Sequence, residues 1–393
     1  MRQILLAGAS FLICVGVPAA DEAEATPAIN LQLAYNADAW QVFDGGLDRG
    51  GAYLDLIDAQ LSVDLDKTLG WGGAQFFLYG IYTNGNSIGE KAGDLNGVSN
   101  IETGVEAVRV VEAWVDQTFA DGHGSLRGGL YDVASEFDAG EVRALFLNSA
   151  QGSGTDFSQS GLNGPSMWWV TSAAVRLNWA FEDGVYARAV VADGVSGDLE
   201  HPKRTAIDFD DGDGALIAAE AGIAREGRLW SIGLWAYTET VADLDALSTR
   251  THHNRGAYVA LEEALWARDE IGFDLSGSLR LGVANDDVNS VSSFFGASLV
   301  GTGVVAARPD DQLGLAVAVA EIGSKGRQLI ADAGGDPANR EINIELTYYA
   351  DITEWLSLQP DLQWVIAPGG DGAVDDAFVA GLRLQLKNNW SVD

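Results

Sequence analysis

Residues 356–366, LSLQPDLQWVI, and residues 377–387, AFVAGLRLQLK, carry the pattern that decides the fold. In both stretches apolar side chains occupy every second position, and mostly polar side chains or glycine lie between them. The polar positions of the first stretch are Ser357, Gln359, Asp361 and Gln363. Such period-two alternation indicates a β-strand with one apolar and one polar face. The chain therefore ends in a pair of two-faced strands.

The same alternation recurs along the chain and predicts sixteen strands, with ends placed to within about 2–4 residues. Their ranges are 29–36, 52–65, 73–83, 108–119, 125–132, 171–180, 185–193, 215–225, 228–239, 255–264, 270–283, 291–301, 311–322, 340–350, 355–366 and 377–387. Connections after even-numbered strands are short. Those after odd-numbered strands are mostly long, at 37–51, 84–107, 133–170, 194–214, 240–254 and 323–339.

Short turns at one end and long loops at the other are typical of a bacterial outer-membrane barrel. We therefore predict an all-β fold, a transmembrane antiparallel up-and-down β-barrel of 16 strands with short periplasmic turns and long external loops. Its apolar face points to lipid and its polar face lines the lumen. The alternative is a soluble β-propeller or a pair of sandwiches. That alternative requires hairpins of similar length or a fixed blade repeat, and the chain has neither.

The first twenty residues have the pattern of a secretory signal. Arg2 precedes an apolar run from Ile4 to Val17, and small residues follow before Asp21. We expect residues 1–20 to be cleaved after export through the Sec pathway. Residues 21–28 then form a short N-terminal segment, and residues 29–393 form the barrel domain. The only cysteine, Cys14, lies in the signal, so the mature protein is expected to contain none.

Composition excludes two classes of protein. The chain has 23 Lys and Arg against 57 Asp and Glu, a net charge of −34, and 47% hydrophobic residues. Disorder requires low hydrophobicity together with high charge. A nucleic acid would be repelled by such an acidic protein, so no nucleic-acid partner is expected.

The sequence also lacks the motifs of an enzyme or a metal protein. The acidic run DFDDGDG at 208–214 does not have the spacing of a calcium-binding loop. His252 and His253 are expected to be a solvated pair in a loop. No P-loop is present. We expect no catalytic residue, no metal site and no cofactor. A periplasmic sugar-binding protein or a glycosidase using Asp208 and Asp210 is the least favoured alternative.

Several blocks of the sequence are similar to one family. They are GVSNIE (97–102), VRVVEAWVDQ (108–117), LRGGLYDVASEFD (126–138), ALFLNSAQG (144–152), FSQSGLNGPS (157–166), VVADGVSGD (190–198), GALIAAEAG (214–222), ELTYYADITEWLSLQPDLQWVIAPGG (345–370) and GLRLQL (381–386). On these blocks the chain resembles the carbohydrate-selective porins of Gram-negative outer membranes, OprB type. The chain departs from the family pattern at 284–339. It also ends with Ser391-Val392-Asp393 after Trp390, where outer-membrane barrels usually end on an aromatic residue.

The resemblance implies a 16-stranded porin that admits sugars across the outer membrane. We expect a passive channel for mono- and oligosaccharides. The expected partners are outer-membrane lipid, small sugars in transit and the outer-membrane insertion machinery. The sequence leaves open whether the protein is a monomer or a trimer. The main alternative function is a general or cation-preferring porin, because an acidic lumen raises the local concentration of cations.

Alternation along the strands also assigns candidates for contact with sugars. Charged and amide side chains exchange hydrogen bonds with hydroxyl groups, and aromatic rings can stack on the C–H face of a pyranose. The candidates on the inward faces are Glu112, Trp114, Asp116, Arg127, Arg176, Arg188, Glu220, Trp235, Gln359, Asp361, Gln363 and Arg383. The alternative for Trp114 is a packing residue. On the same strand, Val111 is expected to face lipid.

The longest loop, residues 133–170, is the best candidate to fold into the barrel, because long loops without secondary structure are usually functional. It would bring Glu136 and Arg143 into the lumen. Trp168 and Trp169, just before the next strand, are expected at the lipid interface.

Overall fold

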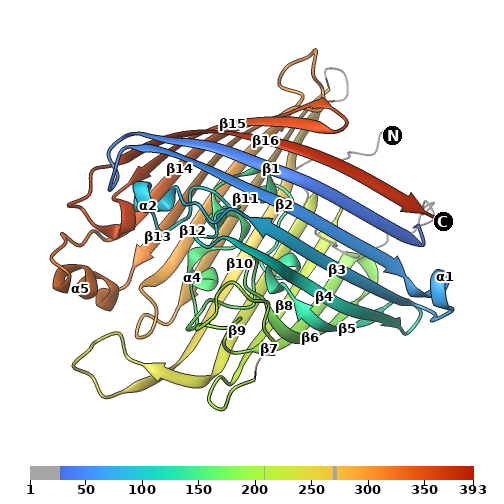
Figure 1. The fold of residues 1–393 in the computed structure, drawn as a ribbon, viewed down its shortest axis with the longest axis horizontal. Coiled ribbons are helices and arrows are strands. Elements are labelled where there is room, and N and C mark those ends of the chain that lie inside the picture. Colours follow the sequence, from blue (N-terminus) through green and yellow to red (C-terminus); the bar gives the residue numbers. More distant parts are fainter. Residues whose placement is uncertain (1–26, 208, 269–271) are drawn as a thin grey trace.

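A computed structural model describes residues 27–393 of the chain, apart from 208 and 269–271. The predicted signal, residues 21–26 and Asp208 lie outside the described residues. The strands form one closed antiparallel barrel, in which each strand pairs with its neighbours in sequence and the first pairs with the last (Figure 1). The predicted fold class is confirmed.

Sixteen strands are present in the described part of the chain. They are β1 (Ile29–Asp44), β2 (Gly50–Asp64), β3 (Ala74–Thr83), β4 (Ala107–Phe119), β5 (Gly124–Tyr131), β6 (Ser172–Ala180), β7 (Val185–Asp193), β8 (Ala215–Arg225), β9 (Arg228–Ala242), β10 (Thr251–Arg268), β11 (Phe273–Ala284), β12 (Val291–Thr302), β13 (Gln312–Ile322), β14 (Arg340–Thr353), β15 (Leu356–Ile366) and β16 (Ala377–Val392).

The helices are short and lie in the connections. The α-helices are α1 (Leu65–Leu69), α2 (Gly89–Ala92), α3 (Ser149–Gly152), α4 (Thr155–Ser158) and α5 (Ser324–Asp332). The 3₁₀ turns are η1 (Val133–Ser135), η2 (Arg143–Leu145), η3 (Glu182–Gly184) and η4 (Pro368–Gly370). Among the described residues, no helix is long and apolar enough to cross a membrane.

Each predicted strand corresponds to one in the structure, but three strands are clearly longer than expected. β1 continues past residue 36 to Asp44, β10 begins at Thr251, and β16 continues to Val392. The predicted loops 37–51 and 240–254 are therefore too long, and His252 lies in a strand. The reason is that backbone pairing continues where the alternation weakens: Asp38 of β1 still pairs with Arg383 of β16.

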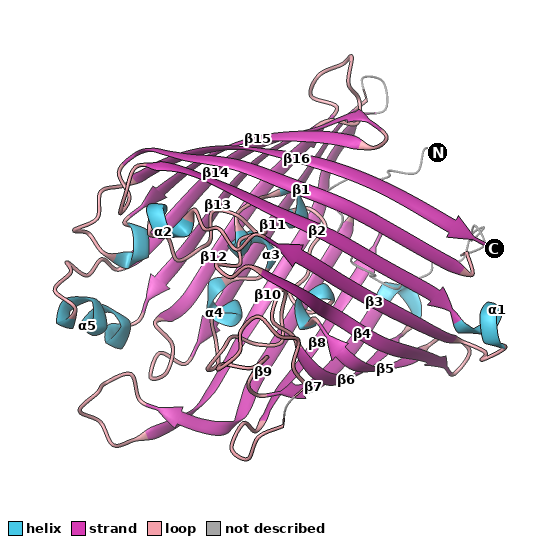
Figure 2. Ribbon diagram, in the orientation of Figure 1, coloured by secondary structure: helices cyan, strands magenta, loops and turns pink. Residues whose placement is uncertain are grey.

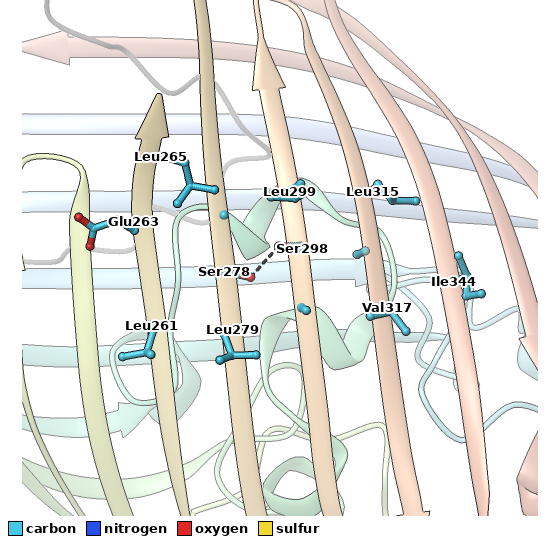
Figure 3. A pocket seen from close by; sticks show the side chains of 13 residues that line it. Leu261, Glu263, Leu265, Ser278, Leu279, Ser298, Leu299, Leu315, Val317 and Ile344 are labelled. Carbon is cyan, nitrogen blue, oxygen red and sulfur yellow. Dashed lines mark hydrogen bonds between the residues drawn. The ribbon is translucent and has the colours of Figure 1, made fainter. Parts of the chain in front are cut away.

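The outer face of the barrel carries exposed apolar side chains at alternate positions, including Val175 and Leu177 of β6 and Ile232 and Leu234 of β9. Figure 3 shows a shallow groove on this face across β10 to β14. Its apolar lining side chains include Leu261, Leu265, Leu279, Leu299, Leu315 and Ile344. On the other face of the same strands, the hydroxyls of Ser278 and Ser298 lie 2.6 Å apart. The two faces therefore differ in polarity, as the alternation predicts.

Glycines in the wall make room for large aromatic side chains on neighbouring strands. Trp40 pairs with Gly381 across the β1–β16 ladder, and a Cβ atom at Gly381 would come within 2.2 Å of the indole. Tyr258 pairs with Gly233 in the same manner, with a separation of 2.1 Å. The aromatic rings can therefore lie against the inner wall instead of projecting across the lumen.

The inner face is less polar than predicted near the long-loop end. Leu54, Leu56 and Ile81 of β2 and β3 point inward and are almost fully buried. They pack with Ile88 and Val98 of the connection between β3 and β4. Loops that enter the barrel thus form a small apolar core with the inner wall, a packing that alternation within single strands does not reveal.

Candidate functional site

The connection between β5 and β6, residues 132–171, runs inside the barrel and is called the long inner loop. In Figure 2 its helices α3 and α4 lie within the ring of strands. Phe157 of α4 stacks on the wall residue Trp235 with ring centroids 5.1 Å apart. Arg280 of β11 hydrogen-bonds Asp156 of α4. The prediction that this loop folds inward is confirmed.

Trp168 and Trp169 lie near the end of the long inner loop, and their predicted position at the lipid interface is wrong. The indole of Trp168 donates to the hydroxyl of Tyr79, on the inner face of β3, over 3.1 Å. The guanidinium of Arg109 lies 5.0 Å from the centre of the Trp169 ring. Both tryptophans pack against the apolar cluster inside the barrel. The loop carries them inward before β6 begins.

A second connection also enters the barrel. Residues 84–106, called the second inner loop, were expected only to be long. The hydroxyl of Ser99 donates to Asp38 of β1 over 2.8 Å, and the amide of Gln363 on β15 donates to the carbonyl of Val98 over 2.8 Å. The two inner loops are also joined to each other, since the backbone N–H of Ser149 donates to the carbonyl of Gly97 over 2.8 Å, so together they narrow the lumen.

Glutamates of the wall hold both inner loops by accepting hydrogen bonds from their backbone N–H groups. Glu262 of β10 accepts from residues 141, 142 and 143 at 2.7, 2.9 and 3.2 Å. Glu345 of β14 accepts from residues 147 and 148 at 2.6 and 3.1 Å. Glu341 accepts from residues 95 and 96 of the second inner loop at 2.7 and 2.9 Å. Hydrogen bonds to a carboxylate are stronger than those between neutral groups, so these contacts fix the loops.

The beginning of the long inner loop, at Glu136, meets three arginines on adjacent strands. Arg127 of β5 and Arg176 of β6 are directly paired in the ladder, and Arg188 lies on β7. Glu136 accepts from Arg176 Nε at 2.7 Å, and its backbone carbonyl accepts from Arg188 at 2.9 Å. Arg127 Nη1 lies 3.8 Å from the Glu136 carboxylate. We call Glu136 and these three arginines, with their acidic partners, the arginine cluster.

The acidic partners of the arginine cluster lie on the neighbouring strands. Asp116 of β4 accepts from Arg127 at 2.9 Å and from Arg176 at 2.7 Å. Glu220 of β8 lies 3.5 Å from Arg188. The cluster thus alternates positive and negative side chains around one part of the wall.

Two further groups of charges lie elsewhere in the lumen. In the first, Arg280 of β11 pairs with Asp138 at 2.8 Å, and Arg143 lies 3.4 Å from Glu262. In the second, Arg383 of β16 forms a bidentate ion pair with the carboxylate of Asp38, with N–O distances of 2.7 and 2.8 Å. Each arginine of these two groups therefore has a carboxylate partner, which offsets the cost of removing both charges from water.

The structure brings eight of the fourteen predicted pore-lining residues together at the arginine cluster: Glu112, Trp114, Asp116, Arg127, Glu136, Arg176, Arg188 and Glu220. Arg143 lies in the group around Arg280. Gln359, Asp361, Gln363 and Arg383 lie on the β15–β16 wall. All face inward and are buried.

The two predicted tryptophans have different surroundings. Trp114 lies under the guanidinium of Arg127, whose Cζ is 3.6 Å from the ring centre, and it donates to Glu112 over 3.0 Å. Trp235 is covered by Phe157 of the long inner loop. Trp235 therefore supports the loop, whereas Trp114 belongs to the arginine cluster.

One residue of β4 was assigned to the wrong face. Val111 is completely buried inside the barrel, although alternation placed it toward lipid. The pairing of β3 with β4 skips one residue there, from Tyr79 with Glu112 to Gly80 with Val110. This β-bulge reverses the faces of the residues before it, so Arg109 points inward and Val108 outward. The sequence gives no local sign of the bulge.

Asp38 and Glu341 are inward residues that the pore-lining predictions did not include. The prediction omitted Asp38 because it ended the first strand at residue 36. The positions of Asn36, Asp38 and Trp40 nevertheless continue the period-two pattern. Glu341 lies on the polar face of a correctly predicted strand. Nothing in the sequence indicates that Glu341 contacts a loop about 245 residues earlier in the chain.

Beyond the lumen, one group has the spacing of metal ligands. Asp243, His252 and Asp287 bring ligand atoms within 4.8 Å of one another. The ammonium of Lys325 lies 2.5 Å from Asp243 and 2.6 Å from Asp287. Lys325 therefore supplies the positive charge that this pair of carboxylates needs. His252 bridges the same two carboxylates at 3.2 and 3.3 Å, so the prediction of a solvated histidine pair is wrong for His252.

Comparisons with known proteins agree with the barrel fold described above. The model of a family described as carbohydrate-selective porin, OprB family, matches residues 48–387. Porin B of Pseudomonas aeruginosa is 24% identical over 91% of this chain and 87% of its own length. A structure of Pseudomonas putida OprB at high pH superposes with a TM-score of 0.82, at 22% identity, over 92% of this chain and 94% of that chain. The channel DcaP of Acinetobacter baumannii has a TM-score of 0.56 at 10% identity, over 94% and 99% of the two chains.

Proposed function

The chain belongs to the OprB family of carbohydrate-selective porins, and from this premise we propose which residues of its lumen act on the sugar. The protein is a carbohydrate-selective channel of the outer membrane and not an enzyme. Its finer function is passive diffusion of neutral mono- and oligosaccharides through the lumen that the two inner loops narrow.

The observation that carries the proposal is the arginine cluster. Arg127, Arg176 and Arg188 face Asp116, Glu136 and Glu220 across short distances. Such a cluster of directly paired opposite charges presents many hydrogen-bonding groups but little net charge to the lumen. A neutral sugar can exchange its hydroxyl hydrogen bonds with water for hydrogen bonds to these groups. An ion gains little net attraction from charges that already neutralise one another.

The remaining candidate residues extend this polar path. The β15–β16 wall supplies amide and charged groups from Gln359, Asp361, Gln363 and Arg383. The long inner loop supplies the charged side chain of Arg143. Passage requires weak and repeated contacts, because a single tight site would retain the sugar. The proposed role of these side chains is therefore a succession of brief hydrogen bonds.

Liposome swelling with a panel of sugars tests the proposal. We expect vesicles that contain the protein to swell faster in glucose and maltose than in charged solutes of similar size. In planar bilayers the same sugars should reduce the ion current. Swelling rates that depend only on solute mass would contradict the proposal.

A general or cation-preferring porin is the second candidate, and the net charge of −34 favours it. An acidic lumen would raise the local concentration of cations. The reversal potential in a potassium chloride gradient separates the two functions. A value close to zero supports the charge-balanced path for sugars, whereas a strongly cation-selective value together with no effect of sugar supports a cation-preferring pore.

We also propose how the protein reaches its membrane. Residues 1–20 act as the signal for the Sec pathway and are then removed. The insertion machinery of the outer membrane recognises β16, and lipid covers the apolar outer face. Fractionation of membranes, N-terminal sequencing of the mature protein and native mass spectrometry test these points, and the last distinguishes a monomer from a trimer.

A further inference from the structure

A neutral polar wall lies between the arginine cluster and the short-turn end of the barrel. It is formed where β1 and β3 begin and where β2 and β4 end. One side of a cavity at this position is lined by Asn30, Gln32, Gln60, Ser62 and Gln75, together with the aromatic side chains of Phe77 and Trp114, and the arginine cluster borders it with Glu112, Arg127 and Glu136. We call the five polar residues and Phe77 the amide wall. It differs from the arginine cluster in that none of its own side chains carries a charge.

The ladder register places these residues in adjacent rows. Asn30 pairs with Ser62, and Ser62 pairs with Phe77. Gln32 pairs with Gln60 in a neighbouring row. Side chains paired across antiparallel strands are direct neighbours, with Cβ atoms about 5 Å apart. The amide wall is therefore one continuous surface and not a set of scattered positions.

The polar groups of the amide wall have unused hydrogen-bonding capacity. Within the part of the chain that the structure describes, the side chains of Gln32, Gln60 and Gln75 form no hydrogen bond with another protein group, and Asn30 Oδ1 is buried without a partner. Gln359 on the opposite side of the β1–β16 seam is different, because its amide donates to Leu145 at 2.7 Å and to Thr347 at 2.9 Å. The amides of Gln32 and Gln60 are half-buried and that of Gln75 is exposed, so these groups are accessible to water and can exchange it for the hydroxyls of a solute.

An aromatic surface borders the free amides. Phe77 stacks on Trp114 with ring centroids 5.0 Å apart and an angle of 29° between the planes. Arg127 lies over the Trp114 ring. Phe77 thus offers an apolar ring beside groups that donate and accept hydrogen bonds. A pyranose has the matching chemistry, with hydroxyl groups at its edge and C–H bonds on its face.

We propose that the amide wall is a second carbohydrate subsite, which binds neutral pyranoses on the periplasmic side of the arginine cluster. The inference rests on the proposed passage of sugars through this lumen. The side chains of the amide wall offer a charged solute no ion pair to replace its lost hydration, and the bordering Arg127 and Glu136 are already paired with each other. The subsite therefore favours neutral sugars a second time, after they have passed the charged cluster.

Current blockade by maltose tests the subsite, with the sugar added first to one side and then to the other side of the same bilayer. We expect the wild-type channel to give two different half-blocking concentrations. Replacing both Gln32 and Gln60 by alanine should raise one of them about five-fold or more, the effect of losing one or two hydrogen bonds, and leave the other unchanged. Phe77→Leu should act on the same side, whereas Phe77→Tyr should retain blockade.

Gln385→Ala is the matched control, because the amide of Gln385 also faces the lumen but already donates to Asn36 over 2.8 Å. It should leave both half-blocking concentrations unchanged. Heat-modifiable gel mobility identifies folded variants. If the double variant does not fold, the single variants Gln32→Ala and Gln60→Ala are measured in its place, each with a smaller shift on the same side.

Three results would overturn the subsite. Folded variants that block like the wild type show that the amide wall does not bind sugar. Equal shifts on both sides show that the amide wall acts through the arginine cluster and not as a separate site. If maltose blocks the wild-type channel from neither side, the proposed sugar path itself fails, and the subsite fails with it.

Discussion

Arg176 is 2% exposed, yet it carries a full charge. It donates to Asp116 and to Glu136, and its third partner is the hydroxyl of Ser125 at 2.5 Å. Removing one member of such a buried group leaves the others uncompensated, which commonly costs about 3–5 kcal/mol. The side chains of the arginine cluster therefore act as a unit.

Replacing Arg176 by methionine tests this coupling. The substitution keeps a long side chain but leaves Asp116 and Glu136 with one positive partner fewer. We expect higher selectivity for cations, because net negative charge appears where the lumen narrows. The reversal potential in a salt gradient measures the change, and thermal unfolding measures the loss of stability.

Arg225→Met is the control for that variant. Arg225 is exposed at the short turn after β8 and donates to the carbonyl of Asp183. It should change neither ion selectivity nor stability by more than about 0.5 kcal/mol. Equal reversal potentials for the Arg176 and Arg225 variants would contradict a special role of the buried arginine.

Most single residues of the lumen could be predicted from alternation, since Asp116, Arg127 and Arg176 lie in regular strands. Two failures have separate physical causes. Val111 lies at a β-bulge, which depends on the pairing of two strands and not on either sequence alone. Asp38 lies in a part of β1 where alanines replace larger apolar residues, so the pattern is weak although the pairing persists.

At the scale of elements, the long inner loop depends on its attachment to the wall. Glu262 alone accepts three consecutive backbone N–H groups. With Glu262→Ala, these donors lose their buried partner, and each unpaired group costs about 1–3 kcal/mol. We expect amide hydrogen exchange at residues 141–143 to accelerate by about 100-fold or more, and the single-channel current to become noisier.

Glu263→Ala is the natural control, because the next residue lies on the opposite face of the same strand. Glu263 pairs with Arg228 on the outside of the barrel at 2.7 Å. Its loss should leave exchange in residues 141–143 at the wild-type rate. If both variants accelerate exchange equally, the effect comes from β10 as a whole and not from the carboxylate that holds the loop.

The connections at the long-loop end are joined by a second cluster, formed by Asp243, His252, Asp287 and Lys325. Its hydrogen bond with Lys325 is the main cause that holds the pKa of Asp243 well below its usual range. The same bond raises the pKa of Lys325. A lowered acidic pKa stabilises the folded contact above the ordinary value of about 4, and this stabilisation is lost as the pH falls toward the lowered value.

Spin labels can follow this cluster, because the only cysteine of the chain, Cys14, lies in the predicted signal. Labels at Ala246→Cys and Gln328→Cys would report the distance between the β9–β10 loop and α5. We expect one narrow distance distribution at pH 5–8 that broadens below about pH 4. Lys325→Met should broaden it at every pH. A distribution that is independent of pH and of Lys325 would contradict the role of the cluster.

The period-two alternation predicted all sixteen strands, but it did not predict the paths of the loops. The long inner loop was predicted to fold inward only from its length. The second inner loop has few features in sequence that distinguish it from an external loop. It is held by Glu341 and Gln363, both far away in the chain. Contacts of this separation follow from closure of the barrel, which places β15 next to β16 and β16 next to β1.

At the scale of the whole molecule, closure depends on the ladder between β1 and β16, which runs from Ile29 with Val392 to Asp44 with Phe378. The residues after Trp390 contribute only its last pairs. Truncation after Trp390 should therefore leave a closed barrel and place an aromatic residue at the terminus, as in most outer-membrane barrels. We expect the truncated protein to be assembled at least as efficiently as the full chain, measured by heat-modifiable gel mobility of isolated membranes.

Truncation after Leu386 is the comparison for that variant, because it removes the pairs of β16 with residues 29–34. It should greatly reduce the amount of folded protein. If truncation after Trp390 is equally harmful, the last three residues have a role in assembly beyond their strand pairs.

The anchoring of both inner loops by β14, a strand far along the chain from either loop, also bears on the order in which the barrel is assembled. Residues 147 and 148 are bound to Glu345 of β14, and residue 96 is bound to Glu341. These partners are synthesised long after the loops. We therefore expect the sheet to curl around loops that are already within its concave side, with the β1–β16 seam closing last. In this order of assembly the loops are in place before the barrel closes. A barrel that closed earlier would leave both loops outside the lumen.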